Sequence, residues 1–99
     1  MTRMEHAVQQ HDSGSKGAFF IADTDGKHVA TMSYSRANQS LVIIDHTDVD
    51  PSLAGQGIGR VLLGAFVEWA RRSSTKVMPL CPFAKAQFDK DASIRDVLL

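Results

Sequence analysis

Apolar and polar positions along the chain predict five strands and two helices. Residues 28–35 alternate cleanly between apolar and small polar side chains, which indicates a half-buried strand of an antiparallel sheet. Residues 18–22 are rich in aromatic and β-branched side chains, which also favours a strand. The Asp25-Gly26 pair between these segments predicts a hairpin, because glycine tolerates positive φ.

Three further segments complete the predicted sheet. Residues 41–49 begin with a run that is apolar on both faces, as in a central strand covered on both sides. Residues 76–80 form the fifth strand, in which Pro79 cannot donate a backbone hydrogen bond and should lie at an edge, a bulge or a splayed point. Residues 4–10 form a weak candidate for a first strand, and residues 11–17 predict a turn.

The strongest helical pattern follows Gly57. Apolar residues recur there at helical spacing and should form one wide buried face. They are Ile58, Val61, Leu62, Ala65, Phe66 and Trp69. Arg60 falls on the opposite, solvated side of this helix. A second, short helix is predicted over residues 82–89 because it opens with a proline, and Ser93 resembles the cap of a last helical turn.

These elements follow the order β-β-β-β-α-β-α. Antiparallel strands followed by a strand–loop–helix–strand crossover predict an α/β (α+β) fold, with a mixed, mostly antiparallel sheet and helices packed on it. A chain of 99 residues is long enough for one core. We therefore expect residues 1–99 to form a single compact domain.

Charge and composition exclude several classes of function. Eleven Lys and Arg balance eleven Asp and Glu, so broad nucleic-acid binding is not expected. No apolar run is long enough to predict a membrane span, and residues 1–6 lack the apolar region of a secretory signal. One cysteine and four histidines without ligand spacing predict no metal site. We expect a cytoplasmic protein, either a monomer or a homodimer.

Residues 55–60, Gly-Gln-Gly-Ile-Gly-Arg, join the central strand to the long helix. A glycine-rich loop at a helix N-terminus presents backbone N–H groups and the positive end of the helix dipole to an anion. The Walker A spacing is absent because Arg60 and Val61 follow Gly59, and the dinucleotide spacing lacks its third glycine. The loop can also be no more than a tight strand-to-helix turn.

The loop matches the acyl-CoA pattern Q/R-x-x-G-x-G/A over residues 54–59, with Ala54 at the first position. Residues 46–49, His-Thr-Asp-Val, precede it, and residues 79–83, Pro-Leu-Cys-Pro-Phe, follow it. With these three segments the chain resembles the compact, YjdJ-type branch of the GCN5-related N-acetyltransferase (GNAT) superfamily. The matched stretch runs from about residue 41 to residue 88.

The resemblance implies that acetyl-CoA binds as the acyl donor. Backbone amides of the loop would hold its pyrophosphate; they belong to Gly55, Gln56, Gly57, Ile58, Gly59 and Arg60. The strand ending near Val49 would pair with the pantetheine arm, in a gap where it parts from residues 76–80. Phe83 can contact the cofactor or belong to the core. The Arg60 side chain can pair with a phosphate or lie in solvent.

Three side chains are candidates for chemistry. Cys81 precedes Pro82 at a predicted helix N-terminus, a setting that favours a thiolate, and it can accept the acetyl group or be a structural cysteine. His46 can act as a general base or only as a hydrogen-bonded residue at a strand end. Asp48 shares its face and can orient it, attract an amine or be a plain carboxylate. Thr47 lies on the other face and receives no role.

The resemblance thus predicts an N-acetyltransferase that transfers acetyl from acetyl-CoA to an unidentified amine of a small molecule or a protein. The amine can attack directly, with His46 or water as the base, or after transfer to Cys81. The acceptor-site helices of larger relatives have no counterpart in this sequence. A non-catalytic acyl-CoA-binding or protein-interaction module is therefore the alternative, and a purely structural domain is the third possibility.

Overall fold

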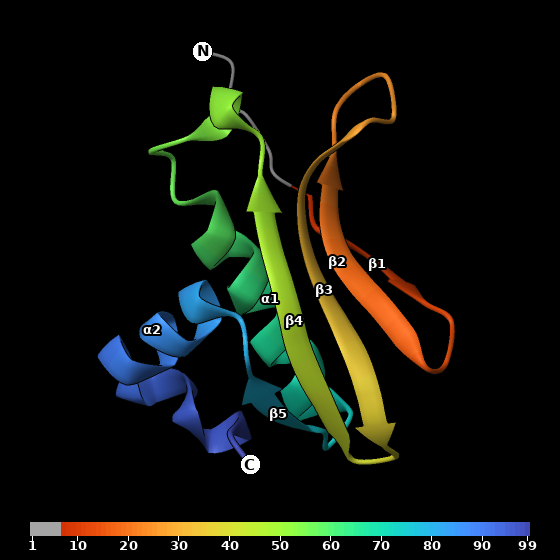
Figure 1. The fold of residues 1–99 in the computed structure, drawn as a ribbon, viewed down its shortest axis with the longest axis vertical. Helices are drawn as coiled ribbons and strands as arrows, with labels where there is room; N and C mark the ends of the chain where they lie inside the picture. Colours follow the sequence, from red (N-terminus) through yellow and green to blue (C-terminus); the bar gives the residue numbers. More distant parts are fainter. Residues whose placement is uncertain (1–6) are drawn as a thin grey trace.

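Five strands form one mixed sheet in the computed structural model, which describes residues 7–99 (Figure 1). The strands lie in the order β1-β2-β3-β4-β5. Strands β1 to β4 pair antiparallel, and β5 pairs in parallel with β4. Their bounds are β1 (Gln9–Asp12), β2 (Lys16–Ala22), β3 (His28–Asn38), β4 (Leu41–Val49) and β5 (Lys76–Pro79). This arrangement confirms the predicted mixed, mostly antiparallel sheet.

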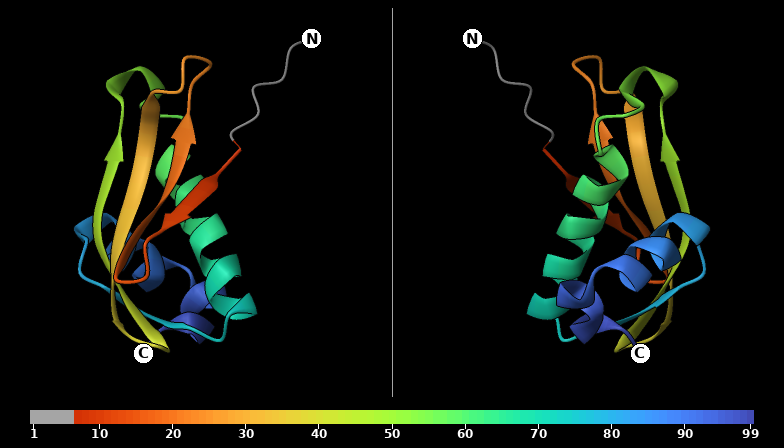
Figure 2. Two further views of the ribbon diagram at one scale, coloured as in Figure 1. Left: turned by 90° about the vertical axis from the view of Figure 1, so that its right-hand side faces the viewer. Right: turned by 90° about the vertical axis from the view of Figure 1, so that its left-hand side faces the viewer.

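The long helix α1 (Ile58–Arg72) connects β4 to β5 and covers one face of the sheet (Figure 2). A short 3-10 helix, η1 (Pro51–Leu53), precedes the glycine loop. Helix α2 (Pro82–Lys90) and a second 3-10 helix, η2 (Ala92–Val97), pack beside α1 and β5. Within residues 7–99, no helix lies over the opposite face of β2 and β3 (Figure 2). We call this the open face, and the face toward α1 the helix face.

The core lies between α1 and the helix face. Alternate residues of β3 are buried against the helix, which confirms the alternation predicted for residues 28–35, and β2 and β4 follow the same pattern. The covering on both faces expected for the apolar run of β4 is not found, because Leu41 and Ile43 are only half-buried. An aromatic cluster of Phe19, Tyr34, Phe66 and Trp69 occupies its centre, with ring centroids 4.8–5.9 Å apart. A Cβ at Gly17 would lie 2.4 Å from the Tyr34 ring. Only glycine at this position of β2 therefore leaves room for the ring.

The buried Tyr34 hydroxyl ties the edge strand β1 to the core. It donates to the Asp12 carboxylate at 2.5 Å and accepts from the Gln10 amide at 2.9 Å. Burial, together with this carboxylate, raises the pKa of Tyr34 to about 12. The hydrogen bond from Tyr34 is the main cause that lowers the pKa of Asp12, followed by the backbone amide of Gly14.

The structure changes the bounds of four predicted strands: β2 begins at Lys16 instead of residue 18, β5 ends at Pro79 instead of residue 80, and β1 and β3 change further. Strand β1 covers Gln9–Asp12, so it reaches into the predicted turn at 11–17, and residues 4–6 of the predicted strand lie outside the described residues. All four residues of β1 are exposed and polar, which leaves no hydrophobic alternation to detect. Strand β3 continues past residue 35 to Asn38 because its partner β4 pairs with it to the end of the hairpin.

The buried face of α1 is wider than, and rotated from, the predicted one. Periodicity predicts Val61 in the buried face, but its side chain is 37% exposed. Leu63, Val67 and Ala70 are buried instead. Helices α2 and η2 pack against α1 in addition to the sheet, and this second covered side adds apolar positions that a single-stripe pattern does not contain.

Candidate functional site

Strands β4 and β5 separate halfway along β4. They pair from Leu41 with Lys76 to Ile44 with Pro79, and no further. The backbone amides of Leu80 and Cys81 both donate to the Ile44 carbonyl at 3.1 Å, which turns the chain away from the sheet. Within the described part of the chain, residues 45–49 therefore pair with β3 on one side only. This opening agrees with the predicted splay at the proline.

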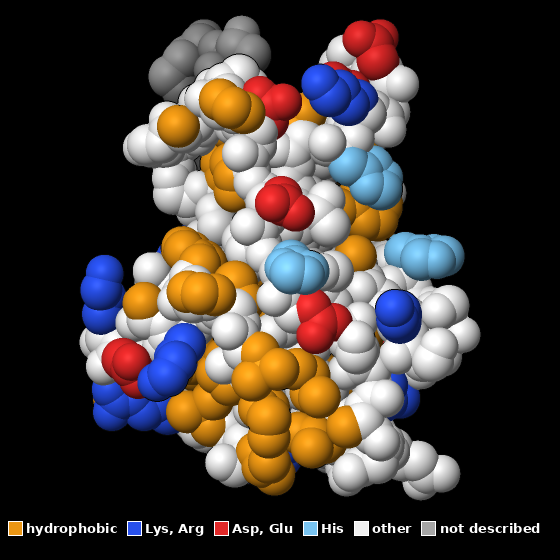
Figure 3. Space-filling model, viewed as in Figure 1, with side chains coloured by type: hydrophobic (Ala, Val, Ile, Leu, Met, Phe, Trp, Pro, Cys, Tyr) orange, Lys and Arg blue, Asp and Glu red, His pale blue; other side chains and the backbone are white. Residues whose placement is uncertain are grey.

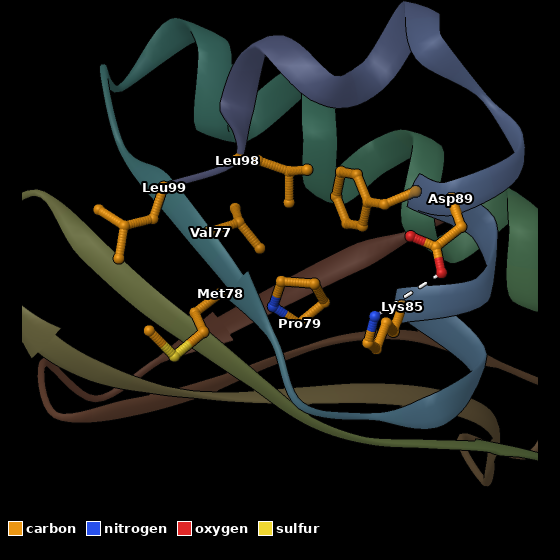
Figure 4. A pocket seen from close by; sticks show the side chains of 8 residues that line it. Val77, Met78, Pro79, Lys85, Asp89, Leu98 and Leu99 are labelled. Carbon is orange, nitrogen blue, oxygen red and sulfur yellow. Dashed lines mark ion pairs between the residues drawn. The ribbon is translucent and has the colours of Figure 1, made fainter.

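The outer edge of β5 forms a separate, mostly apolar hollow of about 270 Å³ (Figure 4). Val77, Met78 and Pro79 contribute the strand side, and Lys85 and Asp89 of α2 form an ion pair at 3.7 Å beside it. Strand β5 is an edge strand, as expected for a strand that contains proline. None of the predicted site residues lines this hollow, so it lies apart from the candidate site.

A β-bulge at Asp45 decides which side chains of β4 point to each face. Ser33 pairs with His46 and Tyr34 pairs with Ile44, so Asp45 is the extra residue. Thr47 then pairs with the buried Met32 and therefore faces the helices. His46 and Asp48 share the open face, which agrees with the prediction that they lie on one side.

The glycine loop leaves backbone amides without partners at the start of α1. Gly57, the N-cap residue, has φ of 70°, and no side chain caps the helix. The first backbone bond of the helix runs from the Val61 amide to the Gly57 carbonyl, so the amides of Ile58, Gly59 and Arg60 have no acceptor in the helix. The Gln56 amide differs, because it donates to the Leu53 carbonyl at 3.3 Å.

Space for an anion lies in front of these amides. A Cβ added at Gly55 (φ 81°) or Gly57 would meet no atom within 4 Å. A cavity of about 330 Å³ extends from the loop to the free edge of β4. It is lined by Thr47, Val49, Leu53, Ala54, Gly55, Gly57, Ile58, Gly59 and Phe83. The loop and the free edge of β4 thus border one continuous cavity on the helix face.

One wall of this cavity comes from α2 and is formed by Phe83. A Cβ at Gly59 would lie 2.6 Å from the ring carbon Cζ of Phe83. Glycine at this position therefore lets the half-buried ring pack directly on the first turn of α1. The arrangement explains the last glycine of the loop through packing between the two helices, whereas Gly55 and Gly57 are required by their positive φ.

Cys81 lies at the inner end of the opening. It is buried and is the N-cap residue of α2, the position that the sequence predicts for it. Its Sγ atom lies 3.2 Å from Oγ1 of Thr47, which itself lines the cavity. Sequence reasoning gave Thr47 no role. The available signal was that Thr47 alternates in phase with Val49, the predicted cofactor residue two positions later.

The Arg60 side chain is directed to α2 instead of the loop. Its guanidinium forms an ion pair with Asp91, while Nη1 is buried and has no hydrogen-bond partner within residues 7–99. Asp91, not Ser93 as the sequence indicated, is the cap of η2, because it accepts from the Ser93 amide at 2.9 Å. The hydrogen bonds from Ser93 and then the charge of Arg60 lower the pKa of Asp91.

A second hollow, of about 470 Å³, lies on the open face at the same opening. It is lined by Lys16, Gly17, Ser33, Tyr34, Asp45, His46 and Leu80. Histidine, acidic and basic side chains lie over the strands on this side (Figure 3). Asp48 lines a further hollow with His28, of about 230 Å³. The predicted site residues are thus divided between two faces: Cys81, Val49, Phe83 and the loop on one, His46 and Asp48 on the other.

Comparison with known proteins agrees with this geometry. Residues 18–97 match the family described as GCN5-related N-acetyl-transferase. Because the match covers most of the chain, the protein belongs to this family. The membership confirms the predicted GNAT superfamily, while the YjdJ-type branch stays a prediction, and it identifies the protein, in general terms, as an acyl-CoA-dependent N-acetyltransferase.

Solved structures share the fold. A GCN5-like protein from Staphylococcus aureus is 36% identical, with a TM-score of 0.71, and the match covers 92% of this chain and 87% of that chain. YhbS from Escherichia coli in complex with CoA is 19% identical, with a TM-score of 0.61 and coverage of 73% and 44%. A ribosomal-protein-alanine N-acetyltransferase from Brucella melitensis is 17% identical, with a TM-score of 0.64 and coverage of 79% and 62%.

The last two structures show the fold alone, and the chain spans less than two thirds of their length. No curated protein matches the sequence. Among residues 7–99, none of the helices has both the length and the hydropathy of a membrane-spanning helix. The same residues contain no group of three or more His, Cys, Asp or Glu side chains placed to hold a metal ion.

Proposed function

We propose that the protein transfers the acetyl group of acetyl-CoA to a primary amine. The observation that carries this proposal is the single cavity that joins the unpartnered amides of α1 to the free edge of β4. Acetyl-CoA has a pyrophosphate followed by a pantetheine arm, in the same order as the amides and the free strand edge along this cavity. Its pyrophosphate would bind the amides of residues 57–60, and its pantetheine arm would lie along residues 45–49 as an additional strand.

The thioester would then reach the inner end of the opening, next to Thr47 and Cys81. An amine can approach it from the open face, where Asp45 and His46 line the adjoining hollow. In the direct route the amine nitrogen bonds to the acetyl carbon, the carbon–sulfur bond breaks, CoA leaves as a thiolate and His46 takes the amine proton. Backbone amides near Val49 would stabilise the oxyanion.

A covalent route uses Cys81 as the first acceptor. Its thiolate would attack the thioester, CoA would leave as a thiolate, and the amine would then attack the acetyl-cysteine. The N-cap position on α2 and the contact with Thr47 support a role for this thiol. The Cys81 thiol is also buried, and this burial supports the direct route, in which the thiol takes no part.

Two measurements test the proposal. Calorimetry with acetyl-CoA should show binding, and the absence of heat at high micromolar ligand would refute it. Acetylation of a panel of amines and lysine peptides should follow; tight binding without any transfer would leave only an acyl-CoA-binding module.

The Cys81→Ala variant separates the two routes. The covalent route predicts loss of transfer with acetyl-CoA binding retained, and mass spectrometry of the wild-type protein should then detect an acetyl group on Cys81. Full transfer by the variant would eliminate that route. Ala86→Ser, a half-buried position on the same helix, controls for a general effect of substitution in α2.

A further inference from the structure

The hollow on the open face carries two opposite charges that have no ionic partner. Lys16 lines it from β2 and Asp45 lines it from β4. Neither side chain forms an ion pair within residues 7–99. The Asp45 carboxylate accepts one hydrogen bond, from the Ser35 hydroxyl at 2.5 Å. The hollow is therefore electrostatically complementary to a ligand with one positive and one negative end.

The strand register places these charges at opposite sides of the hollow. Lys16 pairs with Ser35 on β3, and Ser35 reaches across to Asp45 on β4. The two residues thus flank β3, so their backbones lie about two strand spacings, roughly 10 Å, apart. Between them the lining is formed by Gly17, Ser33 and the chain at Tyr34.

The negative end of the hollow lies at the opening between β4 and β5. The bulge places Asp45 and His46 next to each other on the open face, and Leu80, the first residue after β5, borders the same hollow and is 62% exposed. Thr47, the next residue of β4, lies on the other side of the sheet beside Cys81. An ammonium group held by Asp45 is therefore at the entrance to the proposed thioester position.

We infer that the acceptor is a small amino acid in which a flexible chain separates a primary amine from a carboxylate, with the amine at Asp45 and the carboxylate at Lys16. This inference rests on the proposed acetyl transfer and names its acceptor class. A hollow of about 470 Å³ is the size of a small-molecule site. The bound ammonium first loses one proton to solvent; the neutral amine nitrogen then bonds to the acetyl carbon as the thioester bond breaks, CoA leaves as a thiolate, and His46 takes the second proton from the nitrogen.

The test compares three acceptors with the same six-carbon chain: aminocaproate, hexylamine and hexamethylenediamine. With wild-type protein and saturating acetyl-CoA, kcat/KM for aminocaproate should exceed that for hexylamine by about threefold to fivefold, the effect of one exposed ion pair. The diamine should be the poorest acceptor because its second ammonium meets Lys16. The variant Lys16→Glu should reverse the order, so that the diamine is acetylated faster than aminocaproate.

The control is Lys90→Glu, which makes the same charge change at an exposed lysine of α2 outside the hollow. It should keep the wild-type order of acceptors. Equal rates for all three amines, or an unchanged order in Lys16→Glu, would overturn the acceptor class while leaving acetyl transfer intact. Binding of acetyl-CoA with no transfer to any amine would overturn both.

Discussion

Replacing Gly55 with alanine should separate the role of the loop in binding from its role in folding. Gly55 has φ of 81°, and an added Cβ would meet no atom of the protein within 4 Å. Gly26, in the β2–β3 hairpin, offers a matched control: its φ is 84° and a Cβ there is equally free of contacts. The two substitutions thus create the same backbone strain, one at the candidate anion site and one away from it.

The expected loss of stability is the same for both variants. A side chain in the left-handed region costs about 1–2 kcal/mol. In a domain of this length, 1 kcal/mol lowers Tm by about 4–8 °C, so both melting temperatures should fall clearly and by similar amounts. Only Gly55→Ala places a methyl group in the cavity. Losing one hydrogen bond to a charged phosphate costs about 1.5–3 kcal/mol, which is roughly a tenfold to hundredfold weaker Kd.

Thermal unfolding and calorimetry with acetyl-CoA measure the two effects separately. Gly26→Ala should melt lower than the wild type and bind acetyl-CoA with unchanged affinity. Gly55→Ala should melt equally low and bind at least tenfold more weakly. An unchanged affinity in Gly55→Ala would refute the assignment of the pyrophosphate to this loop. An equal loss of affinity in both variants would show that weaker binding follows from lower stability alone.

Two further substitutions test the packing. Gly64 lies inside α1 with open space around its Cα, so Gly64→Ala should raise the free energy of unfolding by about 1 kcal/mol, and a lower Tm would contradict this. Tyr34→Phe should lower it by about 1–3 kcal/mol near neutral pH. Asp12 has a lower pKa in the folded protein than in the unfolded chain, so its ionisation stabilises the fold above about pH 4, the unfolded pKa. Tyr34 has a raised pKa of about 12 in the folded protein, so its neutral hydroxyl stabilises the fold below about pH 10, the unfolded pKa. The wild-type advantage should therefore shrink below about pH 4 and above about pH 10; a constant difference in denaturant titrations would refute the linkage.

Local patterns were sufficient to predict most of the fold. The alternation in β3, the Asp25-Gly26 turn and the long periodic segment of α1 each have a strong signal in the sequence itself. Pro79 was informative for a different reason, since its missing amide marks the place where the pairing of β4 with β5 ends. The loop before α1 could be placed because it is rich in glycine, and two of these glycines, Gly55 and Gly57, have positive φ.

Features that depend on contacts between distant segments could not be predicted in this way. The bulge at Asp45 is a property of the register between β3 and β4. No residue type in the apolar run before it indicates a bulge. Val61 is exposed, whereas α2 and η2 pack against another side of α1. The Thr47 to Cys81 contact joins residues that are 34 positions apart. The sequence therefore indicated the donor loop more completely than the reactive end.

The bulge also lets side chains of β4 reach both hollows of the proposed site. In a regular strand, successive side chains alternate between the faces, and only one residue of each pair would face the open side. The extra residue lets Asp45 and His46 both reach the open hollow, while Thr47 and Val49 remain in phase with the helix-face cavity. Because β4, within residues 7–99, pairs only with β3 beyond Ile44, the two spaces adjoin at its free edge. In the proposed reaction, donor and acceptor would thus approach one carbon from opposite faces of a single sheet.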